Sequence, residues 1–134
     1  MARNYNVFIS HSWSHHSDLE ALRNLINQRP YFHANYSEVS RDEPINSINA
    51  TYIRTRLRER LQSADVIIAL AGIYASHSQW MEWELDTALG LGKRIIGLVP
   101  RGNERVSAMV SSRASTIIRW NTESIITAIR TYSI

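Results

Sequence analysis

Two short runs of almost wholly apolar residues place the strongest constraint on how this chain can fold. They are DVIIAL, residues 65–70, and RIIGLV, residues 94–99. Uninterrupted runs of this length that are rich in β-branched residues are typical of strands covered on both faces. The segment at residues 79–91 has a helical pattern that begins after Ser78, a predicted N-cap, and ends near Gly90. A strand, a helix and a second strand in this order predict parallel strands joined by a crossover helix.

The same alternation continues on both sides of this unit. Further strands are expected at residues 7–9, 32–36 and 116–118, and further helices at residues 18–27, 48–61 and 104–112 and after a cap at Thr122. Such alternation predicts an α/β fold. For a chain of 134 residues we expect one domain, residues 1–134, with a flavodoxin-like three-layer sandwich architecture. Its five-stranded parallel sheet is expected in the order 2-1-3-4-5, with helices on both faces.

Composition narrows the class of protein. The chain has no cysteine, so a disulfide framework and a thiolate metal site are excluded. Its net charge is only +3 and no block of Lys or Arg occurs, which argues against nucleic-acid binding. The longest apolar run, VIIALAGIYA, covers about half of a membrane span, and the segment MARNYNVFIS is too polar for a signal peptide. We therefore expect a cytoplasmic protein that binds neither nucleic acid nor a membrane.

The predicted strand order also predicts where a ligand binds. In such sheets the ligand lies at the carboxyl ends of the first and third strands, where the winding reverses. Three segments reach this place: SHSWSHHS at residues 10–17, SEVSRDEP at residues 37–44 and GIYASHSQWMEWE at residues 72–84. The first has no glycine, which argues against a flavin-phosphate loop. A phospho-receiver domain needs an acidic pair where Ser10 and His11 stand, so that class is excluded. No glycine-rich fingerprint of nucleotide-binding loops occurs in the sequence.

Glu84 is the acidic residue of most interest near this place. It lies four residues from Trp80 and from Ala88, so the three share one helix face. On an exposed face Glu84 is an ordinary helical carboxylate, whereas in the ligand crevice it has catalytic work to do. Nicotinamide leaves its ribose as a neutral molecule while positive charge develops on the ribose carbon, and a fixed carboxylate stabilises that oxocarbenium ion. Glu84 therefore fits cleavage of a nicotinamide–ribose bond.

The other candidate site residues are expected to contact the bound dinucleotide. They are Ser10, His11, Ser12, Tyr36, Ser37, Tyr74 and Trp80. The three that follow the first strand either contact NAD or cap the next loop and helix. Tyr74 either lines the pocket or packs, and Trp80 either stacks on a base or wedges its helix against the sheet. The histidines at 11, 15 and 16 match no standard metal site, so no metal is expected.

Several stretches of the sequence resemble the Toll/interleukin-1 receptor (TIR) domain family. VFISHS, residues 7–12, resembles the opening of these domains, a strand that ends in Phe-Ile-Ser. SADVIIALAGIYASHSQWMEWELDTAL, residues 63–89, resembles the family's most recognisable segment. Trp80 and Glu84 fit the Trp-x-x-x-Glu pattern of TIR enzymes, which places the family's catalytic glutamate on Glu84. RDEPINS, residues 41–47, stands where the family has a mobile loop, and the spacing agrees over nearly the whole chain.

The resemblance points to the compact TIR-like proteins of Thoeris-type antiphage defence. It implies a NAD glycohydrolase or ADP-ribosyl cyclase that makes a cyclic ADP-ribose-type signal for a separate effector protein. NAD is then the substrate, and no cofactor is implied. The resemblance also implies self-association through TIR–TIR contacts. The sequence departs from the family at His11 and Ser12, where Tyr-Arg is common, and in the loop 38–47, which lacks the usual glycine. Two alternatives stay open: a non-catalytic TIR–TIR interaction module and a nucleoside deoxyribosyltransferase-like enzyme.

Overall fold

Strands and helices alternate in the computed structural model, which describes residues 4–10, 16–28, 33–37, 50–71, 79–99 and 106–133. Within these ranges the strands are β1 (Asn4–Ser10), β2 (His33–Ser37), β3 (Val66–Leu70), β4 (Ile95–Val99) and β5 (Thr116–Arg119). The helices are α1 (His16–Asn27), α2 (Ala50–Ser63), α3 (Gln79–Gly90), α4 (Ala108–Ser111) and α5 (Thr122–Tyr132). The predicted α/β fold, a parallel sheet flanked by helices, is confirmed.

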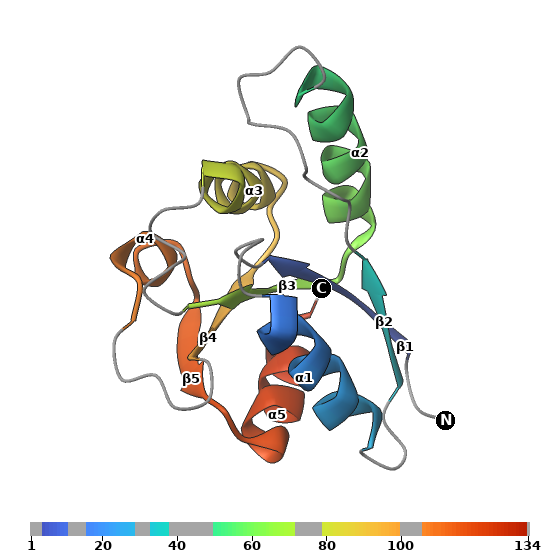
Figure 1. Ribbon diagram of the computed structural model, residues 1–134, viewed down its shortest axis with the longest axis vertical. Coiled ribbons are helices and arrows are strands. Elements are labelled where there is room, and N and C mark those ends of the chain that lie inside the picture. The colour runs from blue at the N-terminus through green and yellow to red at the C-terminus, as the bar shows by residue number, and fades with distance from the viewer. Residues whose placement is uncertain are drawn as a thin grey trace.

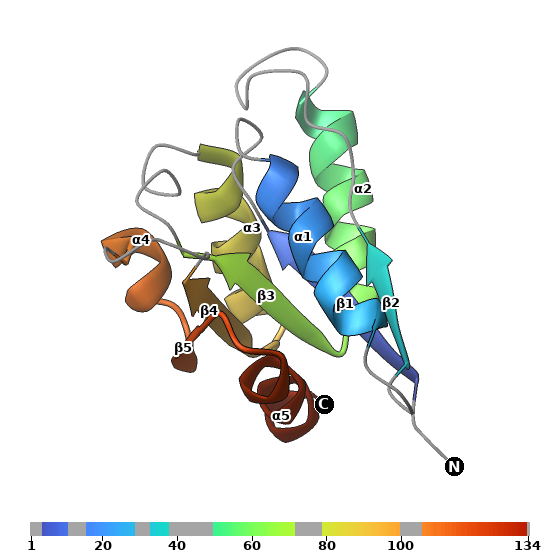
Figure 2. The same cartoon turned by 60° about the horizontal axis from the view of Figure 1, so that its bottom comes forward.

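The described strands form one sheet in the order β2-β1-β3-β4-β5, and all neighbours run parallel (Figure 2). β1 therefore pairs on both sides, with β2 and with β3, and Ser10 stands opposite Ala69. Asp65 fixes the register of β3 on β1. Its backbone N–H donates to the Asn6 carbonyl at 2.7 Å, and its Oδ2 accepts from the Asn6 N–H at 2.8 Å. The carboxyl ends of β1 and β3 are thus held side by side.

Helices α1 and α5 cover one face of the sheet (Figure 1). Alternate residues of β1, namely Tyr5, Val7 and Ile9, contribute to the apolar cluster on this face. The helices contribute Leu22 and Ile26 from α1 and Ile125, Ile126, Ala128 and Ile129 from α5. These helical residues recur at spacings of three and four, which is the pattern expected of a helix with one buried side. The inward positions predicted for the α5 isoleucines are confirmed.

Helices α2, α3 and α4 cover the opposite face (Figure 1). The cluster there contains Phe8 of β1, Ile67 and Ala69 of β3, Ile95 of β4 and the inward sides of the three helices. The predicted inward residues of α2, Ile53, Leu57 and Leu61, are all buried. The strand alternation that turns Phe8 to this face also turns Ser10 to it, because successive side chains point to opposite faces. Ser10 is therefore directed at the layer that contains α3.

Several element boundaries differ from the predicted ones. Strand β1 begins at Asn4 rather than at residue 7. Helix α4 begins only at Ala108, because Ser107 is in an extended conformation and its hydroxyl caps the helix by accepting from the Val110 N–H. The predicted cap of α5, Thr122, is wrong: Asn121 is the N-cap, and its side chain accepts from the backbone N–H of Ser124 at 3.0 Å.

None of the helices within the described ranges has both the length and the hydrophobicity needed to cross a bilayer.

Candidate active site

Ser10 is the last residue of β1 and lies at the carboxyl edge of the sheet. Its backbone is fixed because it pairs with Ala69 of β3, and its side chain is 0% exposed. A buried hydroxyl without a partner costs about 1–3 kcal/mol. A serine in this place, two residues after the core residue Phe8, therefore needs a polar partner in the layer of helices above it.

Glu84 lies in the second turn of α3, within the helix stripe that faces the sheet. The stripe consists of Trp80, Met81, Glu84, Leu85 and Ala88, and all five are buried. Glu84 is 1% exposed, whereas the other acidic residues of the helix, Glu82 and Asp86, point outward. The predicted common face of Trp80, Glu84 and Ala88 is thus confirmed, and the alternative of an ordinary exposed carboxylate is wrong.

The Ser10 hydroxyl donates a hydrogen bond to Glu84 Oε1 at 2.7 Å, and both side chains are buried. The bond joins the end of β1 to the middle of α3, two elements that lie 74 residues apart in sequence. Hydrogen bonds to a charged acceptor are short and roughly twice as strong as neutral ones. Such a bond offsets part of the cost of keeping a carboxylate away from water. The arrangement holds one carboxylate in a fixed place beside the central strands.

Trp80 lies one helical turn before Glu84 and packs in the apolar cluster under α2 and α3. It is 8% exposed. Trp83 packs against the outside of the same cluster, and the two indole rings meet edge to face with centroids 6.2 Å apart and planes at 85°. This geometry is a favourable arrangement for aromatic pairs. Trp80 thus wedges α3 against the sheet, which is one of the two roles predicted for it.

The remaining predicted contacts are placed only in part. The backbones of Tyr36 and Ser37 lie in β2 beside Val7 and Phe8 of β1, near the strand end that carries Ser10. Their side chains lie outside the described part of the structure, as do His11, Ser12 and Tyr74 and the loop at residues 38–47. The sheet therefore brings Ser10 and Glu84 together and places the backbone of β2 next to them.

One buried polar residue near this edge was missed by the sequence analysis. Ser107 is 1% exposed, and its N–H donates to the carbonyl of Ala71 at 2.8 Å, just after β3. Its hydroxyl faces the backbone of α4. The available signal was its position directly before the helical residues, because serine is a preferred N-cap. The backbone of Ser107 thus ties the start of α4 to the residue after β3, while its hydroxyl acts only as the cap of α4.

Comparison with known protein families gives a match over residues 8–105, a segment that includes both Ser10 and Glu84. This segment matches the family described as "Thoeris protein ThsB, TIR-like domain". The match spans well over half of the 134 residues. The chain belongs to the ThsB TIR-like domain family. The resemblance to TIR domains of Thoeris defence is thereby confirmed, and the protein is a defence-related TIR-like protein.

Solved structures share the fold of this TIR-like domain at low sequence identity. A 2-deoxyribosyltransferase from Bacillus psychrosaccharolyticus is 18% identical, with a TM-score of 0.56 over 90% of this chain and 89% of that one. A CMP N-glycosidase from Clostridium botulinum is 14% identical, with a TM-score of 0.55 over 93% and 98%. A putative pilus assembly-related protein from Burkholderia pseudomallei is 14% identical, with a TM-score of 0.59 over 96% and 88%. No curated protein has a significant match to the chain.

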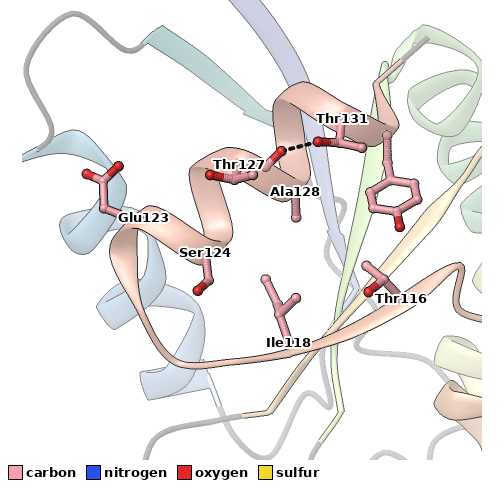
Figure 3. A pocket seen from close by; sticks show the side chains of 8 residues that line it. Thr116, Ile118, Glu123, Ser124, Thr127, Ala128 and Thr131 are labelled. Carbon is pink, nitrogen blue, oxygen red and sulfur yellow. Dashed lines mark hydrogen bonds between the residues drawn. The ribbon is translucent and has the colours of Figure 1, made fainter.

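A cavity of about 460 Å³ lies elsewhere in the TIR-like domain, between β5 and α5 (Figure 3). Ile118 and Ala128 point into it, and hydroxyls of Thr116, Ser124 and Thr131 stand around it. Its apolar residues belong to the cluster under α1 and α5, on the face of the sheet opposite to Glu84. No residue predicted for the active site lines this cavity. Among the described residues, no group of three or more His, Asp or Glu side chains is placed to hold a metal ion.

Proposed function

We propose that this TIR-like domain is a NAD glycohydrolase or ADP-ribosyl cyclase in which Glu84 is the catalytic residue. The observation that carries the proposal is the buried Glu84 carboxylate, held by the Ser10 hydroxyl at the carboxyl end of β1. In doubly wound sheets this is where ligands bind. A carboxylate kept in an apolar helix stripe without a chemical task is unusual, because burying it is costly.

The proposed reaction breaks the bond between the ribose anomeric carbon and the pyridinium nitrogen of NAD. The electron pair of that bond passes to the ring nitrogen, so nicotinamide leaves neutral and needs no proton. Positive charge then develops on the anomeric carbon, and the Glu84 carboxylate stabilises it electrostatically. Fixed charges act most strongly where water is excluded, and the 1% exposure of Glu84 meets that requirement.

The fate of the ribosyl cation determines the product. Attack by water on the anomeric carbon, with loss of a proton, yields ADP-ribose. Attack by a nucleophilic atom of the same dinucleotide yields a cyclic isomer, which requires that water be kept out. We propose the second course, and that the cyclic product is a diffusible signal sensed by a separate effector protein. NAD is in either case the substrate, and self-association through TIR–TIR contacts is proposed as the activating step.

The proposed contacts of the dinucleotide are residues expected at the same edge of the sheet. They are His11, Ser12, Tyr36, Ser37 and Tyr74, together with the exposed margin of Trp80. Because Glu84 is only 1% exposed, the substrate reaches its carboxylate only after neighbouring side chains have moved away. We therefore propose that turnover is slow in the resting protein and rises when the protein assembles.

A second candidate function is transfer or hydrolysis of a nucleoside base. The fold similarity to proteins named 2-deoxyribosyltransferase and CMP N-glycosidase favours it, because a buried carboxylate can serve at any glycosidic carbon. The non-catalytic interaction module is the third candidate, and the cost of burying Glu84 argues against it.

Product analysis by mass spectrometry separates these candidates. The full chain is incubated at increasing protein concentration with NAD, with CMP and with deoxynucleosides in parallel reactions. We expect free nicotinamide and an ADP-ribose isomer from NAD, with a rate per protomer that rises with protein concentration. Release of a free base from CMP or a deoxynucleoside, with NAD intact, would support the second candidate instead. Association of the chain with no product from any substrate would support the interaction module.

A further inference from the structure

We propose that Ser10 is a positioning residue, which holds the Glu84 carboxylate in place for the reaction and does not itself contact the dinucleotide. The inference rests on the proposed function of Glu84 and gives Ser10 a role different from the one that the sequence suggests. Serine has a single O–H donor, and in this structure that proton is directed at Glu84 Oε1.

The burial of Ser10 supports this assignment. Its side chain is 0% exposed, much like that of Glu84 at 1%, but its one O–H proton is already directed at Glu84. A residue that contacts the dinucleotide must present at least one polar atom toward the crevice. Ser10 instead presents its hydroxyl sideways, to a carboxylate on the neighbouring helix at 2.7 Å. Its route of influence on the reaction therefore runs through Glu84.

The sheet makes Ser10 a rigid anchor. β1 pairs with β2 from Asn4 to Phe8 and with β3 from Val7 to Ser10, where Ser10 itself stands opposite Ala69. Phe8, two residues earlier on the same face, is 1% exposed and belongs to the cluster that contains the buried side of α3. Functional groups carried by paired strands are placed more accurately than those carried by loops. The position of the Ser10 oxygen is accordingly set by the fold.

Glu84 needs such an anchor more than a shorter side chain would. Its carboxylate stands at the end of a chain of single bonds that can adopt many rotamers. Its helix neighbours on the buried stripe, Trp80, Met81, Leu85 and Ala88, are apolar. A hydrogen bond in such surroundings is stronger than it would be in water. The bond from Ser10 therefore helps to fix the orientation of the carboxylate, and displacement of a catalytic group by about 1 Å can reduce a rate about 100-fold.

The test compares Ser10→Ala with Ser10→Thr in the nicotinamide-release assay, with kcat and KM measured separately. For Ser10→Ala we expect kcat to fall about 10- to 100-fold, with KM within about twofold of wild type. Ser10→Thr keeps a hydroxyl, so it should recover most of the lost kcat. Should the extra methyl group of threonine prevent folding, Ser10→Cys replaces it: the weaker S–H donor should give an intermediate kcat.

Ser107→Ala is the matched control. Ser107 is also a buried serine, at 1% exposure, but its hydroxyl caps α4. Its removal should lower the melting temperature, because a cap is lost, and leave kcat and KM as they are in wild type. If the fall in kcat of Ser10→Ala reflected only a loosened fold, the Ser107→Ala protein would show a similar fall at a similar melting temperature.

Two results would overturn the inference, and they differ from failure of the proposed function. A Ser10→Ala protein with wild-type kcat, beside an inactive Glu84→Gln protein, would remove Ser10 from the reaction and leave Glu84 in it. A raised KM with unchanged kcat would make Ser10 a substrate contact. If Glu84→Gln instead releases nicotinamide as wild type does, the proposed function fails, and the role of Ser10 fails with it.

Discussion

The Ser10 hydroxyl and the Glu84 carboxylate meet at 2.7 Å although 74 residues separate them in sequence. The contact depends on the parity of β1: a shift of one residue would turn Ser10 to the opposite face, toward α1 and α5. It also depends on the phase of α3, which places Glu84 rather than Glu82 or Asp86 on the inward side. Strand pairing and helix packing thus together determine where the proposed catalytic carboxylate stands.

Removal of the Glu84 charge should make the protein more stable. Glu84→Gln keeps nearly the same shape and an oxygen that can accept from Ser10, but it removes a buried charge. We expect the free energy of unfolding to rise by about 1 kcal/mol, as is common when residues kept for function are replaced. The measurement is urea denaturation at neutral pH. A marked loss of stability would indicate that Glu84 is a structural residue.

Glu82→Gln is the control for that measurement. Glu82 belongs to the same helix, and its side chain is 58% exposed. The same chemical change at an exposed position should alter the free energy of unfolding by less than about 0.5 kcal/mol. The difference between the two variants then isolates the effect of burial.

An added methyl group at Gly97 should crowd the interface of β4 with α4 and β5. A Cβ atom there would overlap Ile117 Cδ1 and would lie 3.3 Å from Val110 Cγ1. Ile117 is 38% exposed and can turn aside, whereas Val110 is buried and cannot. We expect Gly97→Ala to lower the free energy of unfolding by about 1–2 kcal/mol, as is typical of moderate overpacking.

The double variant Gly97→Ala with Ile117→Val tests the cause of that loss. Valine lacks the Cδ1 atom that the new methyl group would meet. Part of the lost stability should therefore return in the double variant, relative to the sum of the two single variants. Strict additivity of the two effects would show that this contact is not the source of the strain.

The pair of Arg113 and Asp86 should contribute little stability, and that little should depend on salt. Arg113 Nε donates to Asp86 Oδ1 at 2.6 Å, near the surface of α3. The hydrogen bond to Asp86 raises the pKa of the Arg113 guanidinium above its ordinary value. The ion pair therefore stabilises the fold at all pH values below the ordinary pKa of the guanidinium. This contribution is lost only as the pH rises through the raised pKa.

A double-mutant cycle of Arg113→Met and Asp86→Asn measures this pair. We expect a coupling of about 0.2–1 kcal/mol at low salt, because exposed ion pairs are weak. The coupling should be the same at pH 7 and pH 9 and should decrease in about 1 M NaCl. A coupling that persists at high salt would mean that the contact is held by packing rather than by charge.

The cap of α5 provides a direct comparison of two adjacent residues. Asn121 accepts from the Ser124 N–H and is the N-cap, whereas Thr122 is already within the helix. Asn121→Ala should reduce the free energy of unfolding by about 1 kcal/mol, and Thr122→Ala should change it by less than half of that. Thermal unfolding of the two variants side by side is sufficient, and equal losses would contradict the assignment.

The apolar runs were enough to predict the α/β class and most of the elements. Residues such as those of β3 and β4 are buried throughout, so hydrophobicity alone identifies them. The cap of α5 was predicted one residue too late because Asn121 and Thr122 are both good capping types. Only the backbone conformation distinguishes them, and Asn121 is the extended one.

The candidate site was predicted less completely than the fold. The phase of α3 follows from sequence, so the common face of Trp80 and Glu84 could be foreseen. The bond of Glu84 to Ser10 could not, because it depends on the distance between a strand end and a helix far away in sequence. Ser107 shows the same limit, since its contact with Ala71 depends on how the chain returns to the end of β3.

The catalytic role of Glu84 is measured by nicotinamide release from NAD by the Glu84→Gln and Glu82→Gln proteins, at concentrations where the wild-type protein is active. We expect Glu84→Gln to lose at least about 100-fold in rate, as loss of a main electrostatic stabiliser does, while remaining folded. Glu82→Gln should stay within about twofold of wild type. A Glu84→Gln protein that releases nicotinamide as fast as Glu82→Gln would contradict the assignment of Glu84 as the catalytic residue.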